Sequence, residues 1–162
     1  MPTTITPNLW FDMNAEEAAE FYCSVFENSR ITNVTHYPEG SPGPAGEVMT
    51  VEFELDGNRF VGINGGPQFK FSEAISFEID CETQDEVDHY WDRLTADGGQ
   101  EIECGWLRDR FGLSWQVVPA GMSELFSDSD KSRAERAMQA MLGMKKLDIA
   151  ALRAAADGQS AA

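Results

Sequence analysis

The sequence is poor in several residue types, and each shortage excludes a class of protein. Its three cysteines, Cys23, Cys81 and Cys104, show no CxxC spacing and are odd in number, so reduced thiols are expected. No apolar run approaches the roughly 18 residues of a membrane-spanning helix, and the N-terminus has neither the basic region nor the apolar core of a secretion signal. We therefore expect a cytoplasmic protein that has no membrane partner.

Positive charge is also scarce. Lys and Arg number 12 against 28 Asp and Glu, which gives a formal net charge of −16. Nucleic-acid binding depends on a basic surface, so nucleic acid is excluded as a partner. The acidity is typical of a solvated surface that aids solubility. At 162 residues the chain is one large domain or two small modules with a core of its own.

The first half combines strand patterns with one helix pattern. Residues 4–11 predict a strand with Leu9 and Phe11 on one side, and Asn14 with Glu17 predicts a capping box at the start of an amphipathic helix. Further strands are expected at 30–37, 49–55 and 59–65, the last two joined by a tight turn. The stretch 38–46 is too rich in Pro and Gly for regular structure.

The second half repeats this plan. A strand pattern precedes Thr83 and Glu86, which predict another capping box, and Val87, Trp91 and Leu94 lie on the apolar side of the helix that follows. The two helix patterns match position by position at one constant offset, which indicates an internal duplication. Each half therefore reads as a strand, a helix and three strands.

The stretch 104–119, CGWLRDRFGLSWQVVP, is the most informative hairpin. Trp115 and Val117 alternate with Ser114 and Gln116, so one face belongs to the core and the other carries polar groups. If the polar face lines a cavity, Gln116 is a candidate ligand contact. Asp109 is expected to accept hydrogen bonds from backbone amides in the turn.

The C-terminal part predicts helices. A short helix is expected at 122–126, and 132–142 presents Ala134, Met138, Met141 and Leu142 as an apolar side. Asp148 is the expected cap of a last helix. We interpret the methionine-rich side as core packing or as a dimer seam.

Several strings carry a family resemblance: NLWFDMNAEEAAEFY, GINGGPQFKFSEAISFEIDC, EVDHYWDRL, CGWLRDRFGLSWQVVP and MKKLDIAALRAA. They resemble the PhnB-like branch of the vicinal oxygen chelate superfamily, which has the glyoxalase and bleomycin-resistance fold. The resemblance implies an α+β fold of paired βαβββ modules within residues 1–120, the first at about 4–66 and the second at about 72–119. A C-terminal helical extension, 121–162, would follow. It also implies a small-molecule cleft and a homodimer.

Such sequences often carry the name 3-demethylubiquinone-9 3-methyltransferase, but we do not expect methyl transfer. A methyltransferase of the common type needs a glycine-rich turn between a parallel strand and a helix. The candidate turn, GINGG at 62–66, runs instead into Pro67 and an aromatic loop.

The resemblance also implies a metal site, but this sequence lacks the usual ligands at the matching positions. Catalytic members carry His, Glu or Gln on the first and last strands of each module, and the matching positions here are Thr6 or Asn8, Asn64, Ala74 or Ser76, and Gln116. None is His, Cys, Asp or Glu, so we expect no tight metal and no cofactor. Glu52, Glu54 and Glu78 can face either the cleft or solvent, and His36 and His89 are interpreted as surface residues.

These arguments predict a ligand-binding site formed by Asn8, Trp10, Asn64, Ser76, Trp106 and Gln116. The favoured function is metal-free small-molecule binding, as in resistance-type relatives. The alternative is a divalent-metal-dependent lyase, isomerase or dioxygenase whose metal is recruited through Gln116 and carboxylates. No catalytic residue is assigned.

Overall fold

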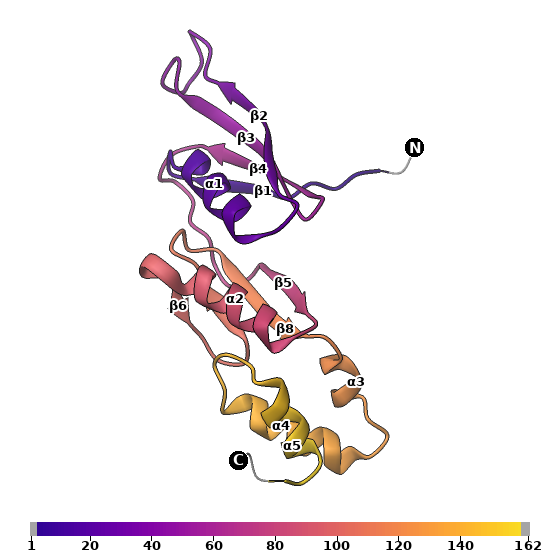
Figure 1. Ribbon diagram of the computed structural model, residues 1–162. Helices are drawn as coiled ribbons and strands as arrows, with labels where there is room; N and C mark the ends of the chain where they lie inside the picture. Colours follow the sequence, from indigo (N-terminus) through magenta and orange to yellow (C-terminus); the bar gives the residue numbers. More distant parts are fainter. Residues whose placement is uncertain (1–2, 160–162) are drawn as a thin grey trace. The chain divides into compact units, whose positions relative to one another are not determined.

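The computed structural model describes residues 3–159 and divides into two compact units, Met1–Phe71 and Ser72–Ala162 (Figure 1). The second unit contains the C-terminal helices as well as a sheet. The predicted separation of 121–162 as an extension of its own stays a prediction.

The first unit is a four-stranded sheet with one helix. It comprises β1 (Asn8–Phe11), α1 (Ala15–Val25), β2 (Arg30–His36), β3 (Val48–Leu55) and β4 (Asn58–Asn64), and the strand order is β1-β4-β3-β2. The first strand is parallel to the last, and the other pairs are antiparallel. Leu9, Phe11 and Phe53 are buried together with Tyr22 of α1, so α1 covers one face of the sheet. Strand alternation leaves the opposite face, which we call the open face, with the polar residues.

The second unit contains a sheet of the same topology. It comprises β5 (Ser76–Cys81), α2 (Gln84–Thr95), a 3₁₀ turn at Ala96–Gly98, β6 (Gln100–Glu101), β7 (Trp106–Arg108) and β8 (Ser114–Pro119). The strand order is β5-β8-β7-β6, and again the first strand is parallel to the last. Two βαβββ modules are therefore present, and the α+β fold class is confirmed. The shared topology is what an internal duplication predicts.

The two helices begin differently, although their sequences match. Thr83 and Glu86 form the predicted capping box of α2, in which the Glu86 amide donates to Thr83 Oγ1 over 3.2 Å. The predicted box of α1 is wrong, because the Asn14 side chain makes no capping hydrogen bond. Instead Asn64, at the end of β4, accepts from the Ala15 amide at 2.8 Å and caps α1 from another strand.

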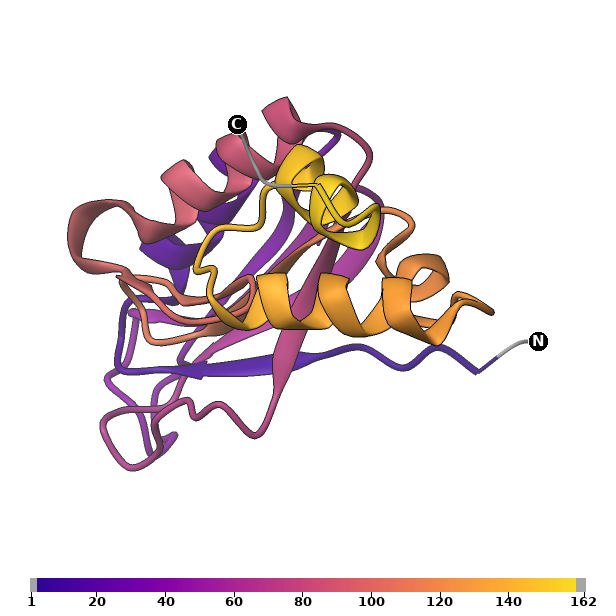
Figure 2. The ribbon, with the colours of Figure 1, turned by 90° about the horizontal axis from the view of Figure 1, so that it is seen from below.

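The chain ends in three helices: α3 (Met122–Phe126), α4 (Lys131–Leu142) and α5 (Ile149–Ala156). The last two lie side by side (Figures 1 and 2), and Asp148 caps α5 as predicted, accepting from the Ala151 amide at 2.8 Å. Core packing is wrong for Met138 and Leu142, which are 37% and 54% exposed, because α4 turns Ala137 inward instead. The dimer seam stays a prediction. Across residues 3–159, no helix is long and apolar enough to cross a membrane.

Candidate functional site

In the second sheet we likewise call the face opposite the helix-covered one the open face. The polar face predicted for the hairpin 104–119 is this open face. Phe77 and Trp115 lie on the helix-covered face, with ring centroids 5.7 Å apart. Their strand neighbours must therefore point the other way. On that open face the register pairs Glu78 of β5 with Gln116 of β8, and Gln116 with Trp106 of β7. A carboxylate, an amide and an indole thus form one row across three strands, and we call it the polar row.

A pocket of about 360 Å³ lies over the polar row. Asp80, one pleat beyond Glu78 on the same face, belongs to the same wall. The opposite wall comes from the C-terminal helices and the segment before α5, which contribute Met122, Phe126, Met141 and Leu147. One side of the pocket is therefore polar and acidic, and the other is apolar.

The segment 144–147 holds the helical wall in place. The amides of Cys104 and Gly105 donate to the carbonyls of Met144 and Lys145, each at 2.8 Å. Gly105 is required there because its φ is +81° and an added Cβ would lie 2.9 Å from Leu147 Cδ1. The glycine of the CGW motif thus lets the tail dock directly on the sheet.

A second contact ties the same segment to α2. Gln84 Nε2 donates to the Leu147 carbonyl at 3.1 Å, and its Oε1 accepts from the Ile149 amide at 2.9 Å. Beside it, Lys146 Nζ lies 2.9 Å from Asp88 Oδ1. This hydrogen bond lowers the pKa of Asp88 and raises that of Lys146.

The Gln116 side chain is positioned by a neighbour on the open face. Its Nε2 donates to Ser76 Oγ over 2.9 Å, which brings two of the predicted site residues together. Ser114, paired with Ser76, is fully buried, and its hydroxyl has no hydrogen-bond partner within the described part of the chain. Ser76, Trp106 and Gln116 therefore share one face, and their role in ligand binding stays a prediction.

Asp109 has the structural role that its turn position predicts. Its Oδ1 accepts from the Phe111 and Leu113 amides at 2.9 and 3.1 Å, and its Oδ2 accepts from Trp115 Nε1 at 2.9 Å. The side chain is buried. Asp109 therefore fixes the hairpin that carries Gln116 and is not a free acid.

Asn8 and Trp10 lie on the open face of the first sheet, since their neighbours Leu9 and Phe11 face the core. Trp10 Nε1 donates to the Gly66 carbonyl at 2.8 Å, and its ring packs edge-on against Phe69 with centroids 4.9 Å apart. An added Cβ on Gly65 would lie 2.1 Å from Trp10 Cζ2. The glycines of GINGG thus admit the indole of Trp10.

Asn64 is placed differently from the other predicted site residues. It lies on the helix-covered face, 3% exposed, and besides capping α1 it donates from Nδ2 to the Val48 carbonyl at 3.0 Å. The open face of β4 presents Val61 and Ile63 instead. The Asn64 side chain therefore hydrogen-bonds two backbone groups of its own unit, and a ligand contact by Asn64 stays a prediction.

The sequence leaves undecided whether Glu52, Glu54 and Glu78 face the cleft or solvent, and the structure places them in two different settings. Glu52 and Glu54 pair with Arg59 and Arg30 at 3.0 and 3.3 Å on the first sheet. Glu78 lines the pocket instead. Both histidines are exposed, as predicted. Among residues 3–159, no group of three or more His, Cys, Asp or Glu could hold a metal ion, so the residues present do not fit the metal site of catalytic relatives.

Two of the cysteine thiols differ in their burial. Burial raises the pKa of Cys81 to about 12, with smaller contributions from Glu86 and Asp80, so this thiol stays protonated. Cys104 has a positive φ of 60° and lines the pocket, partly exposed. Sequence reasoning missed the helical wall, because no local pattern says which helix covers a sheet face. It also did not single out Asp80, although strand alternation places Asp80 on the same face as Glu78.

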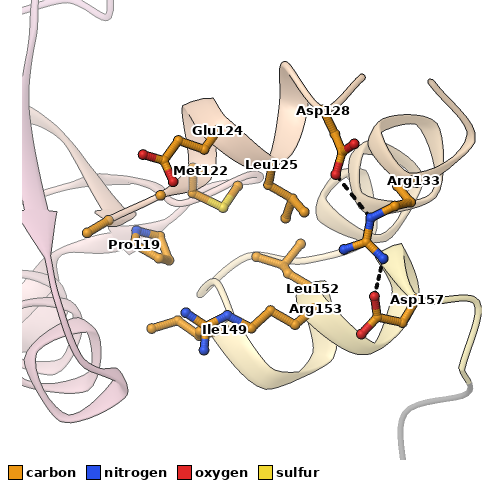
Figure 3. A pocket seen from close by; sticks show the side chains of 12 residues that line it. Pro119, Met122, Glu124, Leu125, Asp128, Arg133, Ile149, Leu152, Arg153 and Asp157 are labelled. Atoms are coloured by element: carbon orange, nitrogen blue, oxygen red, sulfur yellow. Dashed lines mark hydrogen bonds and ion pairs between the residues drawn. The ribbon is translucent and has the colours of Figure 1, made fainter. Parts of the chain in front are cut away.

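A second hollow, of about 390 Å³, lies among α3, α4 and α5 (Figure 3). Arg133 is held there between Asp128, at 3.0 Å, and Asp157. These carboxylates raise the pKa of Arg133. The pKa of Asp128 is lowered first by the hydrogen bond from the Asp130 amide and second by the one from Arg133. The guanidinium of Arg133 is therefore neutralised by its own neighbours, while Arg153 also lines this hollow.

Comparison with known proteins places this chain in a family. The family described as 3-demethylubiquinone-9 3-methyltransferase matches residues 3–118. A PhnB protein from Bacillus cereus, itself described as a putative 3-demethylubiquinone-9 3-methyltransferase, is 35% identical with a TM-score of 0.66. The match covers 73% of this chain and 100% of that one. No curated protein matches.

The chain therefore belongs to this PhnB-like family, within the vicinal oxygen chelate superfamily. A Pseudomonas aeruginosa protein, at 19% identity and a TM-score of 0.60 over 73% of this chain and 98% of that one, shares the fold. So does a fosfomycin resistance protein, FosX, from Listeria monocytogenes, solved with Mn(II) and sulfate. It is 12% identical with a TM-score of 0.51 over 74% of this chain and 90% of that one. The family match ends at 118, so the helical wall of the pocket lies beyond it.

Proposed function

We propose that this protein is a cytoplasmic, metal-free small-molecule-binding protein and that its ligand occupies the pocket over the polar row. The observation that carries the proposal is a pocket of about 360 Å³ that combines an amide, an indole and an apolar wall. Ligand pockets of about 300–1,000 Å³ with few polar groups on mostly apolar walls are usual in proteins. Sequestration of a compound, as in resistance-type proteins, is the activity that such a pocket supports.

Two observations favour binding over the alternative functions. The donor set on the open face lacks the His and carboxylate cluster of a divalent-metal enzyme, so we derive no metal-dependent step. The glycines at 62–66 end β4 and lead into a loop and β5, whereas a nucleotide-type cofactor site needs a helix after the turn. These features support the proposal and argue against methyl transfer.

The test is the variant Gln116→Ala. It should weaken binding of any compound that co-purifies with the protein by about tenfold, because a hydrogen bond to a ligand in a desolvated pocket is worth about 1.4 kcal/mol. The Gln116 side chain is only partly buried, and within residues 3–159 it hydrogen-bonds only Ser76, so the melting temperature should fall by less than about 4 °C. Native mass spectrometry and thermal unfolding measure the two effects.

Gln100→Ala is the matched control, since Gln100 is an exposed amide in β6 of the same sheet and does not line the pocket. It should leave both readouts unchanged. Unfolding of Gln116→Ala at room temperature would make Gln116 a structural amide and would refute the site. Unchanged retention of a co-purified compound in this variant would do the same.

A further inference from the structure

The walls of the pocket differ in charge. Glu78 and Asp80 both line the pocket, whereas none of the described lining residues is Lys or Arg. Neither carboxylate forms an ion pair with a described residue, unlike Glu52 and Glu54 on the first sheet. A ligand with negative charge would meet uncompensated repulsion here, so the wall selects against anions.

The hydrogen-bonding groups point to the same class of ligand. Gln116 Nε2 donates one of its two N–H groups to Ser76 Oγ, and the carbonyl oxygen Oε1 can accept a hydrogen bond from a ligand. Trp106 stands next to Gln116 in the polar row and lines the pocket. An indole face attracts a cation through its quadrupole, and a carbonyl oxygen accepts from an ammonium group.

The opposite wall accommodates an apolar group. Met122, Phe126, Met141 and Leu147 come from the tail, and methionine side chains adapt to irregular apolar shapes. We infer that the pocket takes a small organic cation with an aromatic or aliphatic body, an inference that rests on the proposed function. The cationic nitrogen lies against Glu78, Asp80 and Trp106, and the body lies against the tail.

Three probes of similar shape and different charge test the inference on the full chain: benzylammonium, benzyl alcohol and benzoate. Calorimetric titration at neutral pH should show benzylammonium binding about tenfold tighter than benzyl alcohol, because two nearby carboxylates act on it. Benzoate should bind more weakly than the alcohol. Phe126→Ala should weaken benzylammonium about tenfold, because it removes apolar contact with the ring.

The charge contribution is isolated with the double variant E78Q/D80N. It should lower the affinity for benzylammonium about tenfold and leave benzyl alcohol within twofold. The double variant E39Q/E135Q removes the same net charge at two exposed positions outside the pocket and should change neither.

The outcomes separate this inference from the proposed function. Equal or tighter binding of benzyl alcohol or benzoate, weakened by Gln116→Ala, would overturn the cation inference and keep the binding function. If no probe binds, the charge of a co-purified compound decides: a neutral or anionic compound overturns the inference, and a cation supports it. If neither probes nor a co-purified compound bind, both proposals fall.

Discussion

At the scale of single residues, the capping of α1 that the local sequence assigns to Asn14 is performed by Asn64. Asn64 is buried, caps α1 through the Ala15 amide and donates to the Val48 carbonyl. Asn64→Ala should therefore lower the free energy of unfolding by about 2 kcal/mol, because it leaves two backbone groups without their partners. Chemical denaturation of the full chain measures the loss.

Asn14→Ala is the matched control for that substitution. Asn14 occupies the N-cap position, but its side chain makes no capping hydrogen bond. Its replacement should change the free energy of unfolding by less than about 0.5 kcal/mol. An equal loss in the two variants would contradict the assignment of the cap to Asn64 alone.

At the scale of elements, the docking of the tail depends on an ion pair that responds to acid. The pKa of Asp88 is below its ordinary value because Lys146 hydrogen-bonds its charged form. A carboxyl group with a lowered folded-state pKa contributes stability above its unfolded pKa of about 3.9, and this stability is lost as the pH falls through the folded value. The segment 144–148 should therefore loosen below about pH 4.

Hydrogen-exchange protection of the Ile149 and Leu152 amides, corrected for the intrinsic pH dependence of exchange, reports this loosening. Both amides hydrogen-bond at the docking segment, to Gln84 and Asp148. Asp88→Asn should reduce their protection already at neutral pH and flatten the response to acid. An unchanged acid response in Asp88→Asn would contradict its assignment to the ion pair of Asp88 and Lys146.

At the scale of the whole molecule, the family predicts a homodimer. Native mass spectrometry should show a dimer without stoichiometric metal, and a co-purified compound would appear as an added mass. Leu142, 54% exposed on α4, and Met138 are the candidate seam. Leu142→Glu should produce monomers if α4 forms that seam.

The exposed position Glu135, on the same helix, offers a control, since Glu135→Ala should leave the dimer intact. A dimer that survives Leu142→Glu places the seam elsewhere. A monomeric parent protein contradicts the dimer prediction, and one metal ion per subunit would overturn the metal-free proposal.

The sequence by itself determined the elements and the repeated module. Period-2 alternation fixed which side of the hairpin strand enters the core, as Trp115 and Val117 show, and the capping box at Thr83 fixed the start of α2. These features are local, because each depends on residues a few positions apart. For the same reason the turn role of Asp109 was predictable.

Only the tertiary structure decided which groups meet. Asn64 caps a helix that begins 49 residues earlier, and Gln84 holds a segment more than 60 residues later, and no local pattern encodes either contact. The helical wall of the pocket depends likewise on how the tail docks on the sheet. The sequence could therefore predict that Gln116 lies on a polar face, but only long-range packing made that face one wall of a pocket.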